Sequence, residues 1–297
     1  MISSQPIIFL GCSFTWGEGL ELFQNDEKWI EERSSPSDHT SIRKITDAKS
    51  TNFRKSNRFG GLVATHYNTT ALIHPENGGS LANGLRYLEN TLKTHPSPRA
   101  IIFQNPPILR SPYHLTYSCN CQFCLDTEWR SLHNFWDWIN LKKDKVISDD
   151  ELFNWNRKEW IHKLGTFYER IVNDAGILKS DDYYAIYNKW NTFVAKRLDE
   201  SLPWIINEFK ETEKTIPIYF LDSWHKETSE HFSNYSYFNE RTIPLIGGDG
   251  NEYMNWVEWS KTINKYVISD CYPKSCNDHP SLESHKLIAD SIIRFLG

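Results

Sequence analysis

Four short segments carry residue types that could perform chemistry, although they are spread over the whole chain. They are Gly11-Cys-Ser-Phe-Thr-Trp-Gly17, Asn77-Gly-Gly-Ser80, Gln104-Asn105 and Asp278-His-Pro280. A serine hydroxyl is a weak nucleophile until a base within about 2.6–3.2 Å removes its proton, and histidine is the usual base. Ser13 and His279 are therefore candidates for nucleophilic attack on an ester carbonyl.

Short apolar runs precede three of these segments and predict the strands of a buried parallel sheet. The expected strands are Pro6–Leu10, Thr70–His74, Arg99–Gln104, Ile216–Leu221 and, at an edge because of its proline, Thr242–Ile246. Apolar residues at helical spacing predict helices at Phe59–His66, Ser80–Thr94 and Ser281–Leu296, with Ser281 as N-cap. The polar stretch Gln24–Ser56 is expected to form a surface loop. These elements predict an α/β fold, with the four segments gathered at the carboxyl ends of the strands.

The chain between the third and fourth expected strands has a different composition. It is rich in tryptophan, and its amphipathic stretches predict helices at Asp126–Leu141, Asp150–Asp174 and Asp181–Glu213. Flat rings can stack on sugars, but core packing is expected for the tryptophans of these helices: Trp136, Trp138, Trp155, Trp160, Trp190 and Trp204. We expect one domain over residues 1–297 with a helical insertion at about 111–215.

Taken together, the four segments resemble the sequence blocks of the SGNH (GDSL-type) hydrolase family. The first block, usually Gly-Asp-Ser, is matched by Gly11-Cys12-Ser13, and its Gly-x-Gly-Leu tail by Gly17–Leu20. The other blocks are matched by Asn77–Ser80, Phe103–Asn105 and Asp278–Ser281, with His285 further along. The resemblance implies a flavodoxin-like three-layer α/β/α sandwich with Ser13 as nucleophile, His279 as base and His285 in a packing role.

The resemblance also implies donors for the oxyanion that forms when a serine attacks a carbonyl. Such donors lie at about 2.7–3.1 Å from the developing charge. We expect the backbone amides of Ser13 and Gly79, with Gly78 as the second choice, and the carboxamide of Asn105. Arg58 and Arg110 flank the expected site, and both are expected to be solvated.

The acid that orients the histidine is left open by the sequence. In the family it usually lies three residues before the histidine, and here that position is Cys276. We choose Asp278, although it is the immediate neighbour of His279 in the chain. Asp270 and Asp222 are alternatives, and so is a Ser–His dyad oriented by a backbone carbonyl.

Composition and charge limit the classes of partner. The chain has 297 residues, and 33 basic against 38 acidic side chains give a net charge of −5, which argues against nucleic-acid binding. No apolar run approaches the roughly 20 residues that cross a bilayer. Met1–Leu10 has no basic region and only a short apolar stretch, so we expect no signal peptide, and a location that is cytoplasmic or unknown. The oligomeric state is not indicated.

The six cysteines are too few for a disulfide framework in a chain of this length. Five of them form two groups that could hold a structural zinc ion: Cys119, Cys121, Cys124, Cys271 and Cys276. Ordinary reduced thiols are the favoured interpretation. The expected chemistry needs no metal and no cofactor.

We therefore expect a serine esterase, or acyl-ester hydrolase, acting on a small-molecule or carbohydrate ester such as an acetylated sugar. The alternative is a protein that keeps the fold but has lost the activity, and serves as a binding or structural component, for example in a virion or surface assembly. Three departures from the family motivate this alternative: Cys12 in place of the usual aspartate, Cys276 in place of the usual acid, and the reduced third block.

Overall fold

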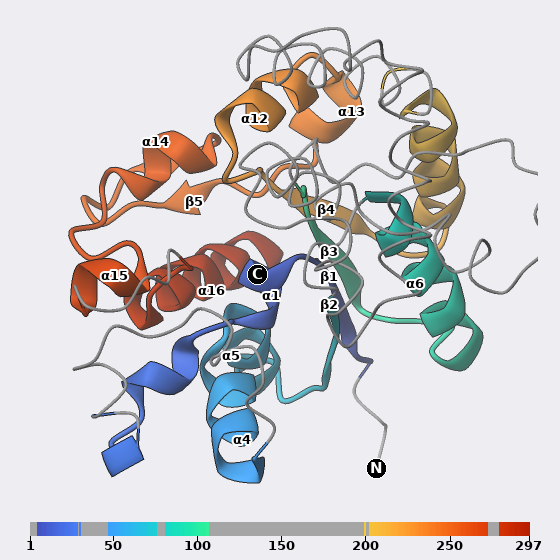
Figure 1. Ribbon diagram of the computed structural model, residues 1–297. Coiled ribbons are helices and arrows are strands. Elements are labelled where there is room, and N and C mark those ends of the chain that lie inside the picture. Colours follow the sequence, from blue (N-terminus) through green and yellow to red (C-terminus); the bar gives the residue numbers. More distant parts are fainter. Residues whose placement is uncertain are drawn as a thin grey trace, which may run out of the picture. The chain divides into compact units, whose positions relative to one another are not determined.

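The computed structural model describes residues 5–28, 30, 47–75, 81–106, 199, 202–272 and 279–297 (Figure 1). Internal contacts divide the chain into two compact units. The first comprises Met1–Gly79, Gly84–Pro106 and Glu208–Gly297, and the second comprises Ser80–Asn83 and Pro107–Asn207. The central sheet lies in the first unit.

Four parallel strands form this sheet in the order β2-β1-β3-β4. They are β1 (Ile7–Gly11), β2 (Ala71–Pro75), β3 (Ala100–Gln104) and β4 (Ile218–Leu221). Ile7 pairs with both Ala71 and Ala100, and Gln104 pairs with Leu221, so the strands end nearly level. The sequence placed all four within two residues of their observed ends, because each is a short run of apolar residues.

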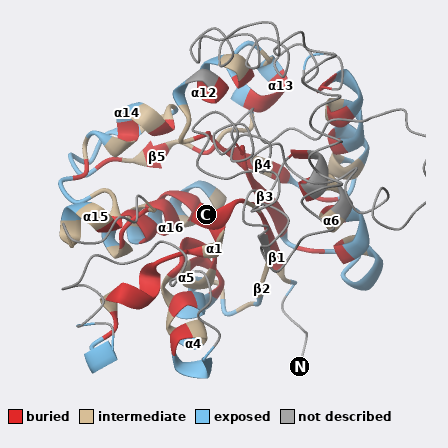
Figure 2. Ribbon diagram, in the orientation of Figure 1, coloured by how far each residue is buried: buried red, intermediate tan, exposed pale blue. Residues whose placement is uncertain are grey.

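Both faces of the sheet are covered, as three layers require. On one face Phe9 packs edge-on against Phe59 of α5 (Phe59–His66), and α16 (Leu282–Leu296) joins the same apolar cluster. On the other face, a side chain at Gly84 of α6 (Leu81–Thr94) would overlap the ring of Phe103. The strands β1 and β3 are therefore buried (Figure 2). The predicted α/β/α sandwich with a parallel sheet is confirmed.

The expected fifth strand divides in two at its proline. Thr242 bridges to Phe220 in parallel at the edge of β4, and the backbone N–H of Ile243 donates to the carbonyl of Phe220 at 2.8 Å. After Pro244 the chain leaves the sheet, and β5 (Leu245–Ile246) pairs antiparallel with β6 (Glu252–Tyr253). Proline has no N–H with which to continue the ladder.

The prediction of one surface loop over Gln24–Ser56 is wrong for its last part. The helix α4 (Ala48–Asn57) begins there, and its N-cap Asp47 accepts a hydrogen bond from the backbone N–H of Ser50 at 2.9 Å. The buried residues of α4 are Ser50 and Arg54, which are polar. Without an apolar stripe, the pattern of hydrophobic residues gave no sign of a helix.

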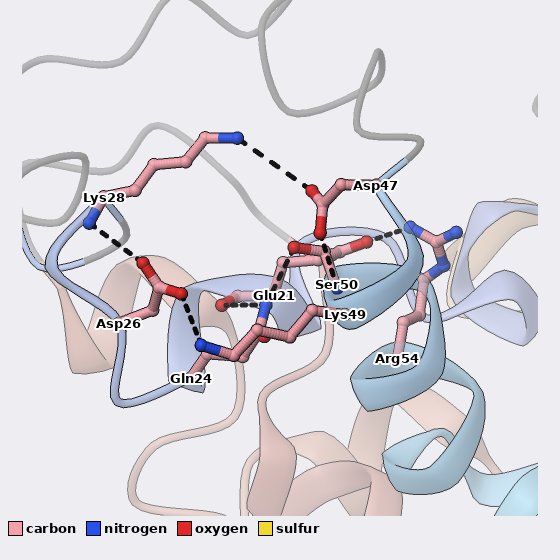
Figure 3. Close-up of polar contacts among 8 residues, drawn as sticks. All are labelled: Glu21, Gln24, Asp26, Lys28, Asp47, Lys49, Ser50 and Arg54. Atoms are coloured by element: carbon pink, nitrogen blue, oxygen red, sulfur yellow. Dashed lines mark hydrogen bonds and ion pairs between the residues drawn. The ribbon is translucent and has the colours of Figure 1, made fainter.

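Polar contacts fix α4 against the 3₁₀ turn η1 (Leu20–Phe23) and the residues after it (Figure 3). Gln24 donates to the Ser50 hydroxyl at 3.1 Å, and Lys49 pairs with Asp26 at 2.6 Å. Within the buried part of this contact, Arg54 pairs with Glu21. A segment of polar composition is thus ordered by hydrogen bonds and charge pairs.

Five further short helices were not predicted. They are α1 (Ser13–Trp16), α12 (Lys226–Phe232), α13 (Ser236–Asn239), α14 (Trp256–Ser260) and α15 (Ile268–Cys271). Each spans two turns or fewer, which is too short for a periodic pattern to stand out.

The helices expected at Asp126–Leu141 and Asp150–Asp174 lie outside the described residues, and of Asp181–Glu213 only residue 199 and residues 202–213 are described, as helix. Trp204, expected to be packed in a core, is exposed there. Within the described part of the chain, no helix is long and apolar enough to span a membrane.

We predict that Gly61→Ala lowers the free energy of unfolding by about 2–3 kcal/mol, a typical penalty for overpacking. A methyl group at position 61 in α5 would overlap the backbone carbonyl oxygen of Lys55 in α4, which cannot rotate away. Urea titration measures the effect. Thr65→Ala, on the exposed side of the same helix, is the control and should change stability by less than about 0.5 kcal/mol. Equal stability of Gly61→Ala and the wild type would contradict the observed close contact of α4 and α5.

Candidate active site

The turn from β1 into α1 places Ser13 at the carboxyl end of the sheet. Gly11 ends β1, and Cys12 has an extended backbone with φ −114° before the first residue of α1, which is Ser13. A side chain at Gly11 would overlap the hydroxyl group of Thr15, so any larger residue here would displace the Thr15 side chain. Ser13 itself is 3% exposed.

His279 is positioned by backbone hydrogen bonds at its own carbonyl and two residues after it. Its carbonyl accepts from the N–H of Ile268 at 2.8 Å, and the N–H of Ser281 donates to the carbonyl of Tyr266 at 2.8 Å. The hydroxyl of Ser281 then accepts from the N–H of Ser284 and caps α16, as predicted. His279 therefore lies just before the N-terminus of a long helix.

The two residues meet, although 266 positions separate them. The Nε2 atom of His279 lies 2.7 Å from the Oγ atom of Ser13. This distance is within the range in which an imidazole can remove a hydroxyl proton. The ring of Phe14 contacts His279 edge-on at 5.1 Å between centroids and stacks on Trp224 at 4.8 Å, so one side of the pair is apolar.

A third polar side chain, which the sequence analysis did not single out, reaches the same nitrogen. Oε2 of Glu18 lies 3.4 Å from Nε2 of His279, and the Glu18 side chain is 8% exposed. Glu18 stands between Gly17 and Gly19, which have φ values of 77° and 85°. Its backbone N–H, like that of Gly17, donates to the carbonyl of Ser13. In the sequence, Glu18 is only a glutamate between two glycines, five residues after the serine, and this pattern does not indicate a contact with His279.

A buried group of charges lies behind this turn. Arg54 and Arg58 lie over the ring of Trp16 at 4.4 and 5.5 Å, and Arg54 pairs with Glu21 as drawn in Figure 3. Burial, and then the charge of Arg54, lower the pKa of Arg58 to about 10. Burial also lowers the pKa of Arg54, and the charge of Glu18 opposes that shift. The expectation that Arg58 is solvated is wrong, because its side chain packs between α4, α5 and the turn at Gly17.

The end of β3 contributes two buried amide side chains. Oε1 of Gln104 accepts hydrogen bonds from the Thr15 hydroxyl at 2.8 Å and from the Cys12 thiol at 3.5 Å. Gln104 thereby links β3 to the nucleophile's turn, and Cys12 takes part in that link. Asn105 follows Gln104, is 1% exposed, and donates its backbone N–H to Leu221 at 2.9 Å. Within the described residues, Oδ1 of Asn105 has no hydrogen-bond partner.

Several of the expected site residues lie outside the described residues: Asp278, Gly78, Gly79, Arg110, Cys119, Cys121, Cys124 and Cys276. Cys271, the remaining member of the cysteine groups, is half-buried and free. The described ranges hold no group of three histidine, cysteine, aspartate or glutamate side chains that could bind a metal ion.

The two alternative acids make other contacts. Oδ2 of Asp222 accepts from the Ser229 hydroxyl at 2.7 Å and from the backbone N–H of Trp256, the first residue of α14, at 2.9 Å. Burial raises the pKa of Asp222 despite these bonds. Oδ2 of Asp270 accepts from the N–H of Val267 at 3.1 Å, at the start of its own helix. Each carboxylate thus has a local structural role.

His285 is fully buried beneath the site. Its Nδ1 atom accepts a hydrogen bond from the backbone N–H of Phe59 at 3.2 Å, and its ring stacks on that of Phe59. Burial, followed by the charges of His279 and Arg58, lowers the pKa of His285 to about 3. His285 is therefore neutral near pH 7 and joins α16 to α5.

From this we predict that His285 makes folding less favourable in mild acid. Between an ordinary pKa of 6.5 and the folded value of about 3, the unfolded chain binds a proton that the folded chain does not, so stability falls as the pH falls. Between pH 7 and pH 5 this amounts to about 2 kcal/mol. His285→Asn keeps an acceptor but does not titrate, so its destabilisation relative to wild type should shrink by that amount at pH 5. Chemical denaturation at the two pH values measures it, and an unchanged difference would refute a buried neutral His285.

Comparison with known proteins finds only weak structural similarity. No family model matches the chain, and no curated protein matches it. Two solved structures are similar at low level. One is a carbohydrate esterase whose active site is described as having divergent catalytic and non-catalytic binding functions, with a TM-score of 0.39 and 13% identity over 100% of this chain and 65% of that one. The other is a family two carbohydrate esterase from Clostridium thermocellum in complex with cellohexaose, with a TM-score of 0.33 and 11% identity over 98% of this chain and 63% of that one. This chain thus spans less than two-thirds of the length of either protein.

Proposed function

We propose that the protein is a serine ester hydrolase in which Ser13 is the nucleophile and His279 the base. The observation that carries this proposal is the 2.7 Å contact between Ser13 Oγ and His279 Nε2 at the carboxyl end of a parallel sheet. Nucleophile and base within hydrogen-bond reach are what covalent catalysis by serine needs.

The reaction follows from the positions of the two atoms. Oγ of Ser13 forms a bond to the ester carbonyl carbon while its proton moves to Nε2 of His279, and the carbonyl π electrons move onto oxygen. When that oxyanion collapses, the bond to the alcohol oxygen breaks and His279 returns the proton to it. Water then attacks the acyl-serine in the same way, with His279 as base, and the acid is released.

Donors for the oxyanion are proposed from three places. The backbone N–H of Ser13 lies at the first residue of α1, where no carbonyl of that helix can accept it. Asn105 is buried directly after the end of β3, and its side chain is the second proposed donor. The amide of Gly79 is the third proposed donor. Loss of one such donor typically costs about 3–4 kcal/mol of barrier.

The proposed substrate is a small acyl ester, such as an acetyl group on a carbohydrate. Phe14 contacts His279 edge-on and stacks on Trp224, which is half-buried. Aromatic side chains of this kind provide a rigid apolar wall beside a reacting group. A short acyl chain suits a nucleophile that is almost completely buried.

We predict that a fluorophosphonate probe labels the wild-type protein at Ser13. The probe forms a covalent bond only with a serine activated by its base, so Ser13→Ala should lose all labelling and His279→Gln should slow it by about a thousandfold or more. Mass spectrometry of the labelled peptide identifies the site. Ser233→Ala, whose hydroxyl bonds the carbonyl of Glu230 on the surface, is the matched control and should label like the wild type.

Absence of labelling in folded wild type would overturn the hydrolase proposal. The remaining function would then be that of a binding or structural protein on the same fold. Release of acetate from acetylated xylan or from an aryl acetate by the wild type, and not by Ser13→Ala, would complete the assignment of an ester substrate.

A further inference from the structure

The nitrogen that must carry the proton during the reaction has a carboxylate beside it. His279 Nε2 lies 2.7 Å from Ser13 Oγ and 3.4 Å from Glu18 Oε2. Glu18 is almost fully buried, and its backbone N–H is bonded to the carbonyl of Ser13. Ser13 and Glu18 therefore come from the same hydrogen-bonded turn of the chain.

Of the charged groups around this turn, Glu18 is the carboxylate in contact with His279. Arg54 of α4 is paired with Glu21 of η1. Arg58, before α5, lies over Trp16 and has its Nη1 atom 3.4 Å from the Trp16 carbonyl. On α16, His285 is neutral because its pKa is about 3. Among the described neighbours, the carboxylate next to Nε2 is thus that of Glu18, which also interacts with the charge of Arg54.

We infer that Glu18 is a positioning residue for the proposed reaction: it stabilises the imidazolium that forms when His279 takes the proton of Ser13, and does so from the nucleophile's own turn. This inference rests on the proposed function. The proton moves from Oγ to Nε2 and then to the leaving oxygen; Glu18 acts on the imidazolium through its charge at 3.4 Å and takes up no proton. No other bond is formed or broken by it.

A carboxylate in this place has two effects with opposite consequences. It lowers the barrier at high pH, where His279 starts neutral and becomes charged in the transition state. It also favours protonated His279 in the free protein, and that form cannot act as a base. Both effects come from the same interaction, so removing it changes the dependence of rate on pH and does not lower the rate equally at every pH.

Glu18→Gln tests this, because glutamine has nearly the same shape and no charge. The rate of fluorophosphonate labelling is measured from pH 4.5 to pH 9. We expect the half-maximal pH to fall by about one unit, the typical size for loss of a neighbouring opposite charge, and the high-pH rate to fall about tenfold. At the lowest pH the two proteins should then label at similar rates. A tenfold loss at every pH, with no change in the half-maximal pH, would overturn the inference.

A second readout does not depend on catalysis. The ring signal of His279 in ¹³C-histidine-labelled protein, identified by its absence in His279→Gln, is followed by NMR as the pH changes. Its midpoint should lie about one unit lower in Glu18→Gln than in wild type. If no protein is labelled by the probe but this midpoint shifts, the proposed function fails and the pairing stands. If labelling is normal and neither pH midpoint shifts, the proposed function stands and the role of Glu18 fails.

Two variants separate charge from structure. Glu18→Asp keeps the charge, so its labelling should have a half-maximal pH closer to wild type than to Glu18→Gln. Glu21→Gln removes a carboxylate from the same segment, but one that pairs with Arg54, so it should lower stability and leave the half-maximal pH of labelling within about 0.3 units of wild type. A shift in Glu21→Gln as large as that in Glu18→Gln would show a general change of charge and would contradict a specific role.

Discussion

The structure of the site depends on a steric constraint where β1 ends. A central strand, buried on both faces, turns into a helix within two residues, and a side chain at position 11 would overlap the hydroxyl of Thr15. The turn brings the backbone of Ser13 to the open end of the sheet. Its carbonyl then accepts two N–H groups, those of Gly17 and Glu18, which fix the direction of the following chain. Ser13, the proposed nucleophile, is thus positioned by the backbone.

The structure also depends on the pairing of the buried charges next to this turn. Two glutamates and two arginines lie within a region that water reaches little, where an unpaired charge would be expensive. The pairing of Arg54 with Glu21 and the placement of both arginines over Trp16 reduce that cost. This arrangement ties α4, a helix of polar composition, to the first strand–helix unit. The local charges near His279 are consequently held in place by the fold and not by flexible surface side chains.

The sequence predicted the elements that are held by apolar burial and missed those held by polar contacts. The strands and α16 were recognised because runs such as Ile7–Leu10 and the apolar face around Ile288 have the right spacing. The helix α4 was missed because its buried members are Ser50 and Arg54. Glu18 was missed for a related reason: the sequence around a single glutamate does not indicate that its side chain is buried. Contacts between residues 18 and 279 arise only in the folded chain, so no local pattern could reveal them.

Hydrogen bonds between main-chain atoms hold the segment that carries His279. The carbonyl of His279 accepts a hydrogen bond from the N–H of residue 268, and the N–H of Ser281 donates to the carbonyl of residue 266. These hydrogen bonds form a short antiparallel bridge between Val267 and Pro280, which fixes the position of the histidine. Backbone hydrogen bonds of this kind do not depend on the identity of the side chains. The position of the histidine therefore does not require a particular side chain at residues 266, 267 or 268. The proposed base is then held by the fold itself, while the charge proposed to support it comes from another part of the chain, the turn at Glu18.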